Sequence, residues 1–314
     1  MKNNQEIVLA SAIDNNYAQH LGVLLVSIFE NKGSEKIKYY VIDGGITEKN
    51  KKRLLKISKK YKFELIFNKI DETQFRDLKV THHFNATIYF CLTVPNILYK
   101  KYNKILFLDA DTIVIGSLRS LWKTDTKNSY LGALCDRENF EHNHHIRLSL
   151  RNKNDYFNSG VMLINTNKWV ENDILNKVVK FVEDNHKIIE YPEQDGLSFI
   201  VDGNYKKIPK KYNYSVIHHP NFRFFKKVKP PQDILIYHFA TSVDKPWNFS
   251  SVNYFKKRYW SYLRKTPWRF SMYKDIRHIT LKKIFIKYKM LFLIFINQQA
   301  EVFEFIKKIK NIGK

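Results

Sequence analysis

Residues 105–111 read Ile-Leu-Phe-Leu-Asp-Ala-Asp. The apolar run Ile105–Leu108 is typical of a buried strand, and two carboxylates follow where that strand ends. In an extended segment, residues i and i+2 point to the same side, so Asp109 and Asp111 can face one ligand. Two close carboxylates repel each other unless a cation lies with them, and their hard oxygens suit Mg²⁺ or Mn²⁺. A loop closed by an Asx turn is the structural alternative for so short a motif.

Before this stretch, apolar strands alternate with segments of helical periodicity. The helical segments carry apolar residues at positions 21, 24, 25, 28 and 29, and then a second set after Thr47, a plausible N-cap. The predicted strands are Glu6–Ala12, Lys38–Asp43 and Phe63–Phe67. This β-α-β-α-β order predicts an α/β fold, a parallel sheet with helices on both faces. Ligands bind outside the carboxyl ends of strands in such sheets, which is where the two aspartates lie.

The alternation continues after residue 111 and stops near Trp247. Residues 174–185 are predicted to form a helix, and the later strand candidates are Tyr130–Cys135, Ser159–Ile164 and Asp233–His238. A basic, aromatic segment begins beyond this point. We therefore expect one α/β domain over residues 1–250 and a separate segment over residues 251–314.

Composition and charge narrow the classes of function. The chain has 314 residues, 44% of them hydrophobic and 27% charged, which is a globular composition. Its formal charge is +24, and residues 255–314 carry 16 Lys/Arg against three Asp/Glu. Such a balance favours a polyanionic partner, although a genome that favours lysine codons would produce the same bias. A nucleic-acid arm is disfavoured because no recognised binding module is present.

Several motifs are absent from the sequence. It contains no G-x-G-x-x-G, no G-x-x-x-x-G-K-[ST], no G-x-S-x-G and no H-E-x-x-H, which disfavours dinucleotide folds, P-loop enzymes and common hydrolases. Cys91 and Cys135 cannot build a disulfide framework or a zinc site, so a reducing compartment is expected. The N-terminus lacks the apolar core of a signal peptide. The longest apolar run, Met290–Ile296, is far shorter than the roughly 20 residues that span a bilayer.

Three further segments contain residues suited to chemistry. His238 ends an apolar strand, and beside two aspartates an imidazole is a reasonable Mn²⁺ ligand, although a lone histidine there is more often structural. Gln194 and Asp195 lie in the sequence Tyr-Pro-Glu-Gln-Asp, for which a helix N-cap is the structural alternative. The sequence Phe-Asn-Ser-Gly at residues 157–160 precedes an apolar strand and is otherwise a turn.

Taken together and in order, these segments resemble glycosyltransferase family 8, and are most similar to its bacterial lipooligosaccharide galactosyltransferases. The matching segments, spread over about residues 6–250, are IDNNYA, LDAD, FNSGVMLIN, EQD and HF…KPW. The resemblance implies a GT-A fold, which is a Rossmann-like mixed sheet with helices on both faces. It also implies a UDP-sugar donor, Mn²⁺ with Mg²⁺ as a possible substitute, and retention of the anomeric configuration.

The resemblance also implies roles for single residues. The uracil and ribose would be held by the first loop, at Ala12, Asp14, Asn16 and Tyr17. The metal ligands would be Asp109, Asp111 and His238, with Ala110 between the two aspartates as part of the donor site. The donor sugar and acceptor would contact Asp136 and Asn158. The catalytic segment would comprise Glu193, Gln194 and Asp195, with Gln194 on the reactive face of the sugar. Lys245 would contact the diphosphate.

These roles indicate a mechanism. The metal ion and Lys245 would stabilise the charge that grows on the departing diphosphate. Retaining glycosidases use a carboxylate nucleophile, but the matching group here is Gln194, a poor nucleophile. We therefore expect attack from the leaving-group side through an oxocarbenium-like transition state, with the leaving phosphate accepting the proton of the acceptor.

The chain departs from the family pattern at three places. In Thr87–Leu92 the family usually has an arginine where this chain has Cys91, which cannot supply charge-assisted hydrogen bonds. Glu193 replaces an aspartate. The segment His-Phe-Ala-Thr-Ser-Val-Asp-Lys-Pro-Trp from His238 lacks the usual glycine and is one residue longer. These changes bear on the donor and leave an impaired enzyme as an alternative.

The basic tail has the profile of helices that lie in a membrane interface, with lysines facing anionic headgroups. A helical cap packed on the domain is the alternative. We predict a UDP-galactose- or UDP-glucose-dependent hexosyltransferase acting on a lipid-linked glycan such as lipopolysaccharide core, in the cytoplasm at the inner face of the membrane. The alternatives are a transferase with a protein acceptor, and a basic membrane- or nucleic-acid-binding protein with a degenerate sugar-nucleotide site.

Overall fold

The computed structural model describes most of the chain. The described residues are 6–70, 73–75, 78, 86–136, 143–215, 231–241, 245–275, 281, 284–285, 288–289 and 292. They form a seven-stranded sheet in the order β3-β2-β1-β4-β7-β6-β8 and a two-stranded sheet of β5 and β9. The strands of the larger sheet are β1 Ile7–Asp14, β2 Ile37–Gly44, β3 Glu64–Lys69, β4 Lys104–Leu108, β6 Leu131–Cys135, β7 Phe157–Asn165 and β8 Tyr205–Lys207.

The first half of this sheet is parallel, as the alternating pattern predicts. β1 pairs in parallel with β2 and β4, and β2 pairs with β3. β7 then runs antiparallel between β4 and β6, which makes the sheet mixed. This reversal brings the start of β7 to the same edge as the ends of β4 and β6. The aspartates after β4, Asp136 after β6 and Asn158 in β7 therefore share one edge.

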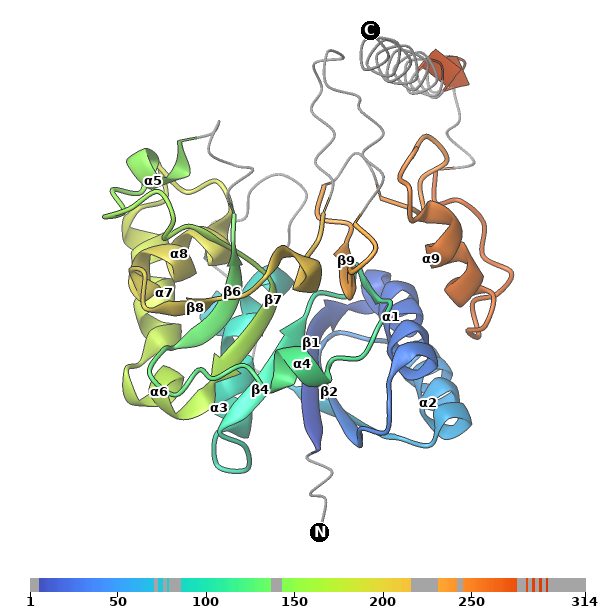
Figure 1. The fold of residues 1–314 in the computed structure, drawn as a ribbon, viewed down its shortest axis with the longest axis horizontal. Coiled ribbons are helices and arrows are strands. Elements are labelled where there is room, and N and C mark those ends of the chain that lie inside the picture. The colour runs from blue at the N-terminus through green and yellow to red at the C-terminus, as the bar shows by residue number, and fades with distance from the viewer. Residues whose placement is uncertain are drawn as a thin grey trace, which may run out of the picture.

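Helices cover both faces of the sheet, as expected (Figure 1). α1 and α2 lie on one face. The 3₁₀ helix η3, Ala86–Thr93, packs on the other face against β1 and β2, with α7 and α8 outside it. Thr47 is the N-cap of α2, as predicted, since its side chain accepts a hydrogen bond from Asn50 N. The helices are α1 Ala18–Asn31, α2 Glu48–Tyr61, α3 Val94–Leu98, α4 Arg119–Trp122, α5 His144–Arg147, α6 Thr166–Glu171, α7 Ile174–Asp184, α8 Pro192–Val201 and α9 Lys256–Leu263.

Two local expectations differ from the structure. The predicted strand Asp233–His238 is only β9, Ile236–His238, because its partner β5 is the short strand Thr112–Val114. The Glu-Gln-Asp segment is not a cap before a helix. α8 begins at Pro192, and the three residues form its first turn.

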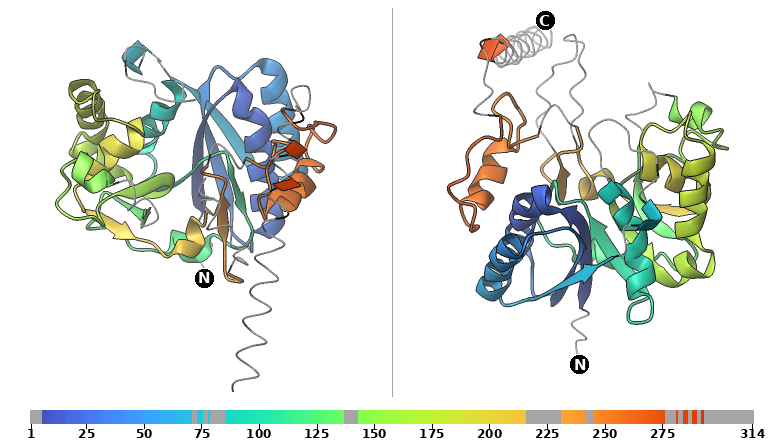
Figure 2. Two further views of the ribbon diagram at one scale, coloured as in Figure 1. Left: turned by 90° about the horizontal axis from the view of Figure 1, so that it is seen from above. Right: turned by 180° about the vertical axis from the view of Figure 1, so that it is seen from behind.

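The segment from residue 251 to residue 275 packs against the preceding 250 residues. Tyr259 in α9 shares a hydrogen bond of 2.6 Å with His20 of α1. The Trp268 ring lies so close to Gly22 that a Cβ there would meet it at 2.9 Å. Leu263 is completely buried. Both views of Figure 2 show this orange segment beside α1. The first part of the basic segment is thus a cap on the domain, and the apolar run Met290–Ile296 lies outside the described residues except for Phe292.

No helix among the described residues has both the length and the apolar character needed to span a bilayer.

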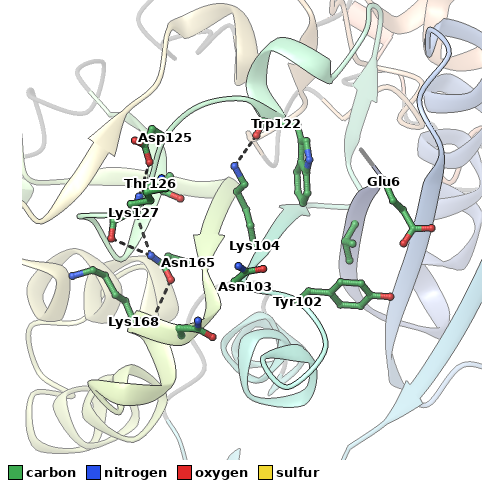
Figure 3. Close-up of a pocket in the computed structure, with 12 residues that line it drawn as sticks. Glu6, Tyr102, Asn103, Lys104, Trp122, Asp125, Thr126, Lys127, Asn165 and Lys168 are labelled. Atoms are coloured by element: carbon green, nitrogen blue, oxygen red, sulfur yellow. Dashed lines mark hydrogen bonds between the residues drawn. The ribbon is translucent and has the colours of Figure 1, made fainter. Parts of the chain in front are cut away.

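A cavity of about 680 Å³ opens at the edge of the sheet where β4 begins (Figure 3). Lys104 at that edge donates to the carbonyls of Trp122 and Thr124, and Asn165 donates to the carbonyl of Thr126. These polar groups serve to tie a loop to the sheet. The cavity lies the length of a five-residue strand, about 16 Å, from the two aspartates. We therefore place the functional site at the opposite edge.

Candidate functional site

Asp109, Asp111 and His238 come together where the two sheets meet. Asp109 leaves β4, and its backbone N–H donates to the carbonyl of Gly160 at 2.8 Å. Asp111 immediately precedes β5, whose first residue, Thr112, pairs with His238 of β9. The backbone N–H of Phe239 then donates to the Asp111 carbonyl at 3.0 Å. Backbone hydrogen bonds and strand pairing therefore hold the three side chains beside one another.

The three side chains form a group suited to a metal ion. One ligand atom from each lies within 4.8 Å of the others. His238 Nε2 is 3.3 Å from Asp111 Oδ1 and 3.7 Å from Asp109 Oδ2. Two carboxylate oxygens and one imidazole nitrogen match the preference of Mn²⁺, and of Mg²⁺ to a lesser degree.

Gly160 forms the floor of this site. A Cβ at residue 160 would clash with the imidazole Cε1 of His238 and would come within 2.8 Å of Asp109 Oδ2. The absence of a side chain here leaves the volume in which the ligand atoms converge. The donor set and this space fit a divalent cation.

Lys245 supplies positive charge to the same group. Its ammonium donates to Asp111 Oδ2 and to the Phe239 carbonyl, each at 2.5 Å. Burial alone would raise the pKa of Asp111, but the positive charge of Lys245 outweighs burial and holds that pKa below its usual range. The pKa of Asp109 is raised by burial and by the charge of Asp111. The cluster thus keeps Asp111 ionised and ready for a cation.

A chain of hydrogen-bonded side-chain amides leads from His238 to the first turn of α8 and ends at a tyrosine hydroxyl. His238 Nδ1 lies 3.0 Å from Asn213 Oδ1, and Asn213 Nδ2 donates to Asn158 Oδ1 at 2.7 Å. Asn158 Nδ2 donates to Gln194 Oε1 at 3.2 Å. Gln194 Nε2 in turn donates to the Tyr156 hydroxyl at 2.9 Å. Gln194 is therefore held at both ends of its amide.

Asp195 follows Gln194 in the first turn of α8, and several hydrogen bonds hold its carboxylate in place. It is completely buried, and Arg147 donates to both of its oxygens, at 2.8 and 3.0 Å. The Tyr156 hydroxyl and the backbone N–H of Tyr191 also donate to it. A carboxylate so enclosed has no free face for a substrate. These contacts fix Asp195 in the first turn of α8 beside Gln194, and the sequence predicts both among the catalytic residues.

Glu193 and Cys91 lie near each other on the other side of Gln194. The Glu193 carboxylate accepts a hydrogen bond from Ser159 Oγ at 2.9 Å. Burial raises the pKa of Glu193 to about 7, and the charge of Asp109 adds to this rise. Burial also raises the pKa of the Cys91 thiol, with a further contribution from the charge of Glu193. The family's arginine position and the replaced acid are thus electrostatic neighbours.

The first loop lies close to the aspartates. Asp14 accepts hydrogen bonds from Tyr17 N and Asn16 Nδ2, both at 3.0 Å, which closes the 3₁₀ helix Asn15–Tyr17. Burial raises the pKa of Tyr17, and the charges of Asp111 and Asp109 add to it. Ala12 lies near the end of β1, and Ala110 is buried between the two aspartates. Asp136 lies at the same edge, joined through its backbone N–H to the Tyr156 carbonyl.

Four residues of this site are not predicted from the sequence. Three of them belong to no sequence motif: Asn213, Tyr156 and Arg147. The fourth, Gly160, is part of the Phe-Asn-Ser-Gly segment, but the sequence predicts no role for it. Arg147 and Asp195 are 48 residues apart, and Asn213 and Asn158 are 55 apart. Only the fold shows that they touch.

Comparisons with known proteins agree with this site and fold. The sequence model described as glycosyl transferase family 8 matches residues 8–251. General stress protein A of Bacillus subtilis is 27% identical over 288 residues, which is 85% of this chain and 96% of that protein. A lipopolysaccharide 1,2-glucosyltransferase of Escherichia coli is 27% identical over 274 residues, covering 83% of this chain and 79% of that protein.

Solved structures show the same fold. The galactosyltransferase LgtC, in complex with donor and acceptor sugar analogues, superposes with a TM-score of 0.74 at 23% identity. The match covers 87% of this chain and 99% of that one. GlyE of Streptococcus pneumoniae TIGR4 has a TM-score of 0.63 at 23% identity, covering 85% of this chain and 62% of that one. The GT-A architecture expected from the sequence is confirmed.

Adding one methyl group at Gly160 tests whether the space above this residue holds the cation. Gly160→Ala should weaken Mn²⁺ binding by about 10- to 100-fold, the range typical of disturbed support for metal ligands. Titration with Mn²⁺ followed by electron paramagnetic resonance measures this. Gly132→Ala is the matched control, because its new Cβ would meet no atom closer than 3.3 Å. Unchanged Mn²⁺ affinity in a folded Gly160→Ala protein would place the cation elsewhere.

The raised pKa of Glu193 predicts a pH dependence of stability. Since this pKa is about 7 in the folded protein and about 4.3 in an unfolded chain, the folded state holds the extra proton between these values. Stability from this group is full below pH 4 and is lost as pH rises through 7. Glu193→Gln, which can still accept from Ser159, should therefore be more stable than the wild type at pH 8 by about 3.5 kcal/mol.

Urea denaturation in the presence of a chelator, at pH 5 and pH 8, measures this difference. At pH 5 the difference should fall to about 1 kcal/mol, because this pH lies only slightly above the pKa of the unfolded carboxyl. An equal difference at both pH values would show that Glu193 does not titrate in this range.

Proposed function

The chain belongs to glycosyl transferase family 8, and we propose that it moves a hexose, galactose or glucose, from a UDP-sugar to the terminal sugar of a lipid-linked glycan such as lipopolysaccharide core. We propose further that the transfer retains the anomeric configuration and depends on Mn²⁺. The main observation in support of this activity is the group of Asp109, Asp111 and His238, which lies beside Lys245. The names of relatives, lipopolysaccharide glucosyl- and galactosyltransferases, support the choice of hexose and acceptor.

In this proposal the metal-binding group and the lysine have separate tasks. Asp109, Asp111 and His238 would hold the divalent cation, which as a Lewis acid stabilises negative charge on the departing diphosphate. Lys245 lies 2.5 Å from Asp111 and can turn its ammonium toward a phosphate placed there. The first loop, with Asp14, Asn16 and Tyr17, would hold the nucleoside because it lies at the same strand edge.

The polar chain favours attack on the same face as the leaving group. Gln194 is neutral, and its Oε1 already accepts hydrogen bonds from Asn158 and from the backbone N–H of Ser159. Asp195 is enclosed by Arg147 and Tyr156. Neither group is free to act as a nucleophile on the sugar. The leaving phosphate would instead accept the proton of the acceptor hydroxyl, with Gln194 fixing the reactive face.

We propose that the protein associates peripherally with the inner face of the cell membrane, from the cytoplasm. The described part of the C-terminal segment exposes large apolar side chains next to arginines and lysines. Phe270 is 82% exposed and Met272 is 66% exposed. Residues 276–314 add nine Lys/Arg against two Asp/Glu. Apolar and basic side chains in one segment suit an anionic lipid surface.

Release of UDP tests the donor and the cation together. We expect Mn²⁺-dependent UDP release from one UDP-hexose in a panel, measured with and without simple glycoside acceptors. Asp111→Asn should lower the rate by at least about 100-fold, since it removes a metal ligand and leaves the Lys245 charge unbalanced. Asp125→Asn, the same change at the opposite edge of the sheet, should keep the rate. Equal activity of Asp111→Asn would refute the cation assignment, and hydrolysis of no UDP-hexose would count against the donor class.

Truncation tests the membrane proposal, and the packing of α9 decides where to cut. Removing residues 276–314 should weaken sedimentation with anionic vesicles but leave UDP affinity unchanged. A cut at residue 255 would remove the buried Tyr259 and Leu263 and expose the core beside α1. Vesicles of zwitterionic lipid are the control. Unchanged binding to anionic vesicles after removal of residues 276–314 would contradict the proposal for this segment.

A further inference from the structure

Asn213 lies buried behind His238, on the side away from the two aspartates. Its side chain is 2% exposed. The residue ends the 3₁₀ helix Lys210–Tyr212, and the next residue, Tyr214, accepts a hydrogen bond from His238 N at 2.9 Å. Asn213 is thus held by the backbone against β9. Its amide touches His238 on one side and Asn158 on the other.

The direction of each hydrogen bond in this contact can be derived from a backbone donor. Gly160 N–H can only donate, and it points at the Asn158 side chain at 3.1 Å. The Asn158 atom that it meets must therefore be the carbonyl oxygen, Oδ1. That same oxygen faces Asn213 at 2.7 Å, so Asn213 must present its NH₂ group there.

With its NH₂ group committed to Asn158, Asn213 turns its carbonyl oxygen to His238. An amide oxygen accepts and does not donate, so His238 Nδ1, 3.0 Å away, must carry a proton. In the neutral imidazole the other nitrogen then has a free lone pair. That nitrogen is Nε2, the atom that faces the carboxylates of Asp111 and Asp109.

A second backbone donor fixes the other end of the same chain. Ser159 N–H donates to the Gln194 side chain at 3.2 Å, so the atom that it meets is Oε1. Asn158 Nδ2 donates to that oxygen too, which agrees with the direction derived from Gly160. Two consecutive backbone N–H groups of β7 thus determine the orientation of three side-chain amides.

We propose that Asn213 is a positioning residue that holds His238 in the tautomer protonated at Nδ1 and so presents Nε2 to the divalent cation. Through Asn158 it also ties the cation ligand to Gln194. The inference rests on the proposed function for the presence of the cation. The tautomer and the order of hydrogen bonds follow from the contacts alone. Outer groups that orient a ligating histidine in this way typically contribute 10- to 100-fold to metal affinity.

Nitrogen NMR on the full-length, metal-free protein tests the tautomer directly. At a pH where the imidazole is neutral, the wild-type His238 should carry its proton on Nδ1, and a His238→Gln spectrum assigns the signal. A neutral wild-type ring protonated at Nε2 would overturn the proposal. This measurement needs no substitution at Asn213, so it decides the question even if a variant there fails to fold.

Mn²⁺ titration without donor then tests the consequence. Asn213→Ala should lower Mn²⁺ affinity by about 10- to 100-fold. Asn213→Asp still accepts from Nδ1, so it should keep the wild-type tautomer; because it sets an acceptor oxygen against Asn158 Oδ1, it should lose some Mn²⁺ affinity but less than Asn213→Ala. Asn253→Ala is the matched control, because it removes another buried amide that contacts β9 through the Tyr237 hydroxyl.

The outcomes separate this inference from the proposed function. Equal Mn²⁺ affinity of Asn213→Ala and wild type would overturn it, as would an equal loss in the Ala and Asp variants. None of these measurements uses a sugar nucleotide. A protein that hydrolyses no UDP-hexose but behaves as expected here would refute the function and keep the inference. An active transferase whose neutral His238 is protonated at Nε2 would support the function and refute the inference.

Discussion

Repulsion between two carboxylates is the constraint on which the site depends. Asp109 and Asp111 lie at the end of one buried strand, where low dielectric makes like charges costly. The structure offsets this cost with groups brought from far along the chain. Lys245 and His238 both approach Asp111, and the pairing of β5 with β9 sets the position of His238. A cation bound by the same oxygens would take over part of the stabilisation that Lys245 and His238 give to the two carboxylates. The same interactions therefore affect both folding and metal binding.

The polar chain behind His238 gives this charged group a rigid support. Each buried amide has its polar ends paired, which avoids the cost of an unpaired donor or acceptor in the interior. Asn213 and Asn158 link the metal ligand to Gln194, and Arg147 with Asp195 anchors the far end. The reactive face of the sugar and the cation would then be held by one connected network. A displacement of His238 would therefore change the position of Gln194, and the reverse.

Aromatic packing joins the first loop, at Tyr17, to the segment that carries Lys245. The Trp247 ring stacks on His20 with centroids 3.6 Å apart, and Tyr17 meets both rings edge-on. Burial lowers the pKa of His20 to about 3, with the charge of Lys274 contributing, so the ring stays neutral and packs as an apolar group. Its Nδ1 pairs with Tyr259 of α9. The C-terminal cap therefore helps to place both Tyr17 and Lys245.

The sequence by itself determined the elements and the chemistry of this protein, because both are local. Strand and helix periods are visible within ten residues, and the spacing of Asp109 and Asp111 indicated a candidate cation site, with a turn as the structural alternative. The order of motifs indicated the family and so the mixed sheet. Only the tertiary structure decided which distant residues touch. Asn213 and Gly160 joined the site because the antiparallel β7 and the short β5–β9 pair bring their segments to one edge, and Arg147 of α5 joined it through its contact with Asp195 in α8. Backbone pairing across dozens of residues leaves no periodic trace in sequence, and the same holds for the packing of α9 on α1.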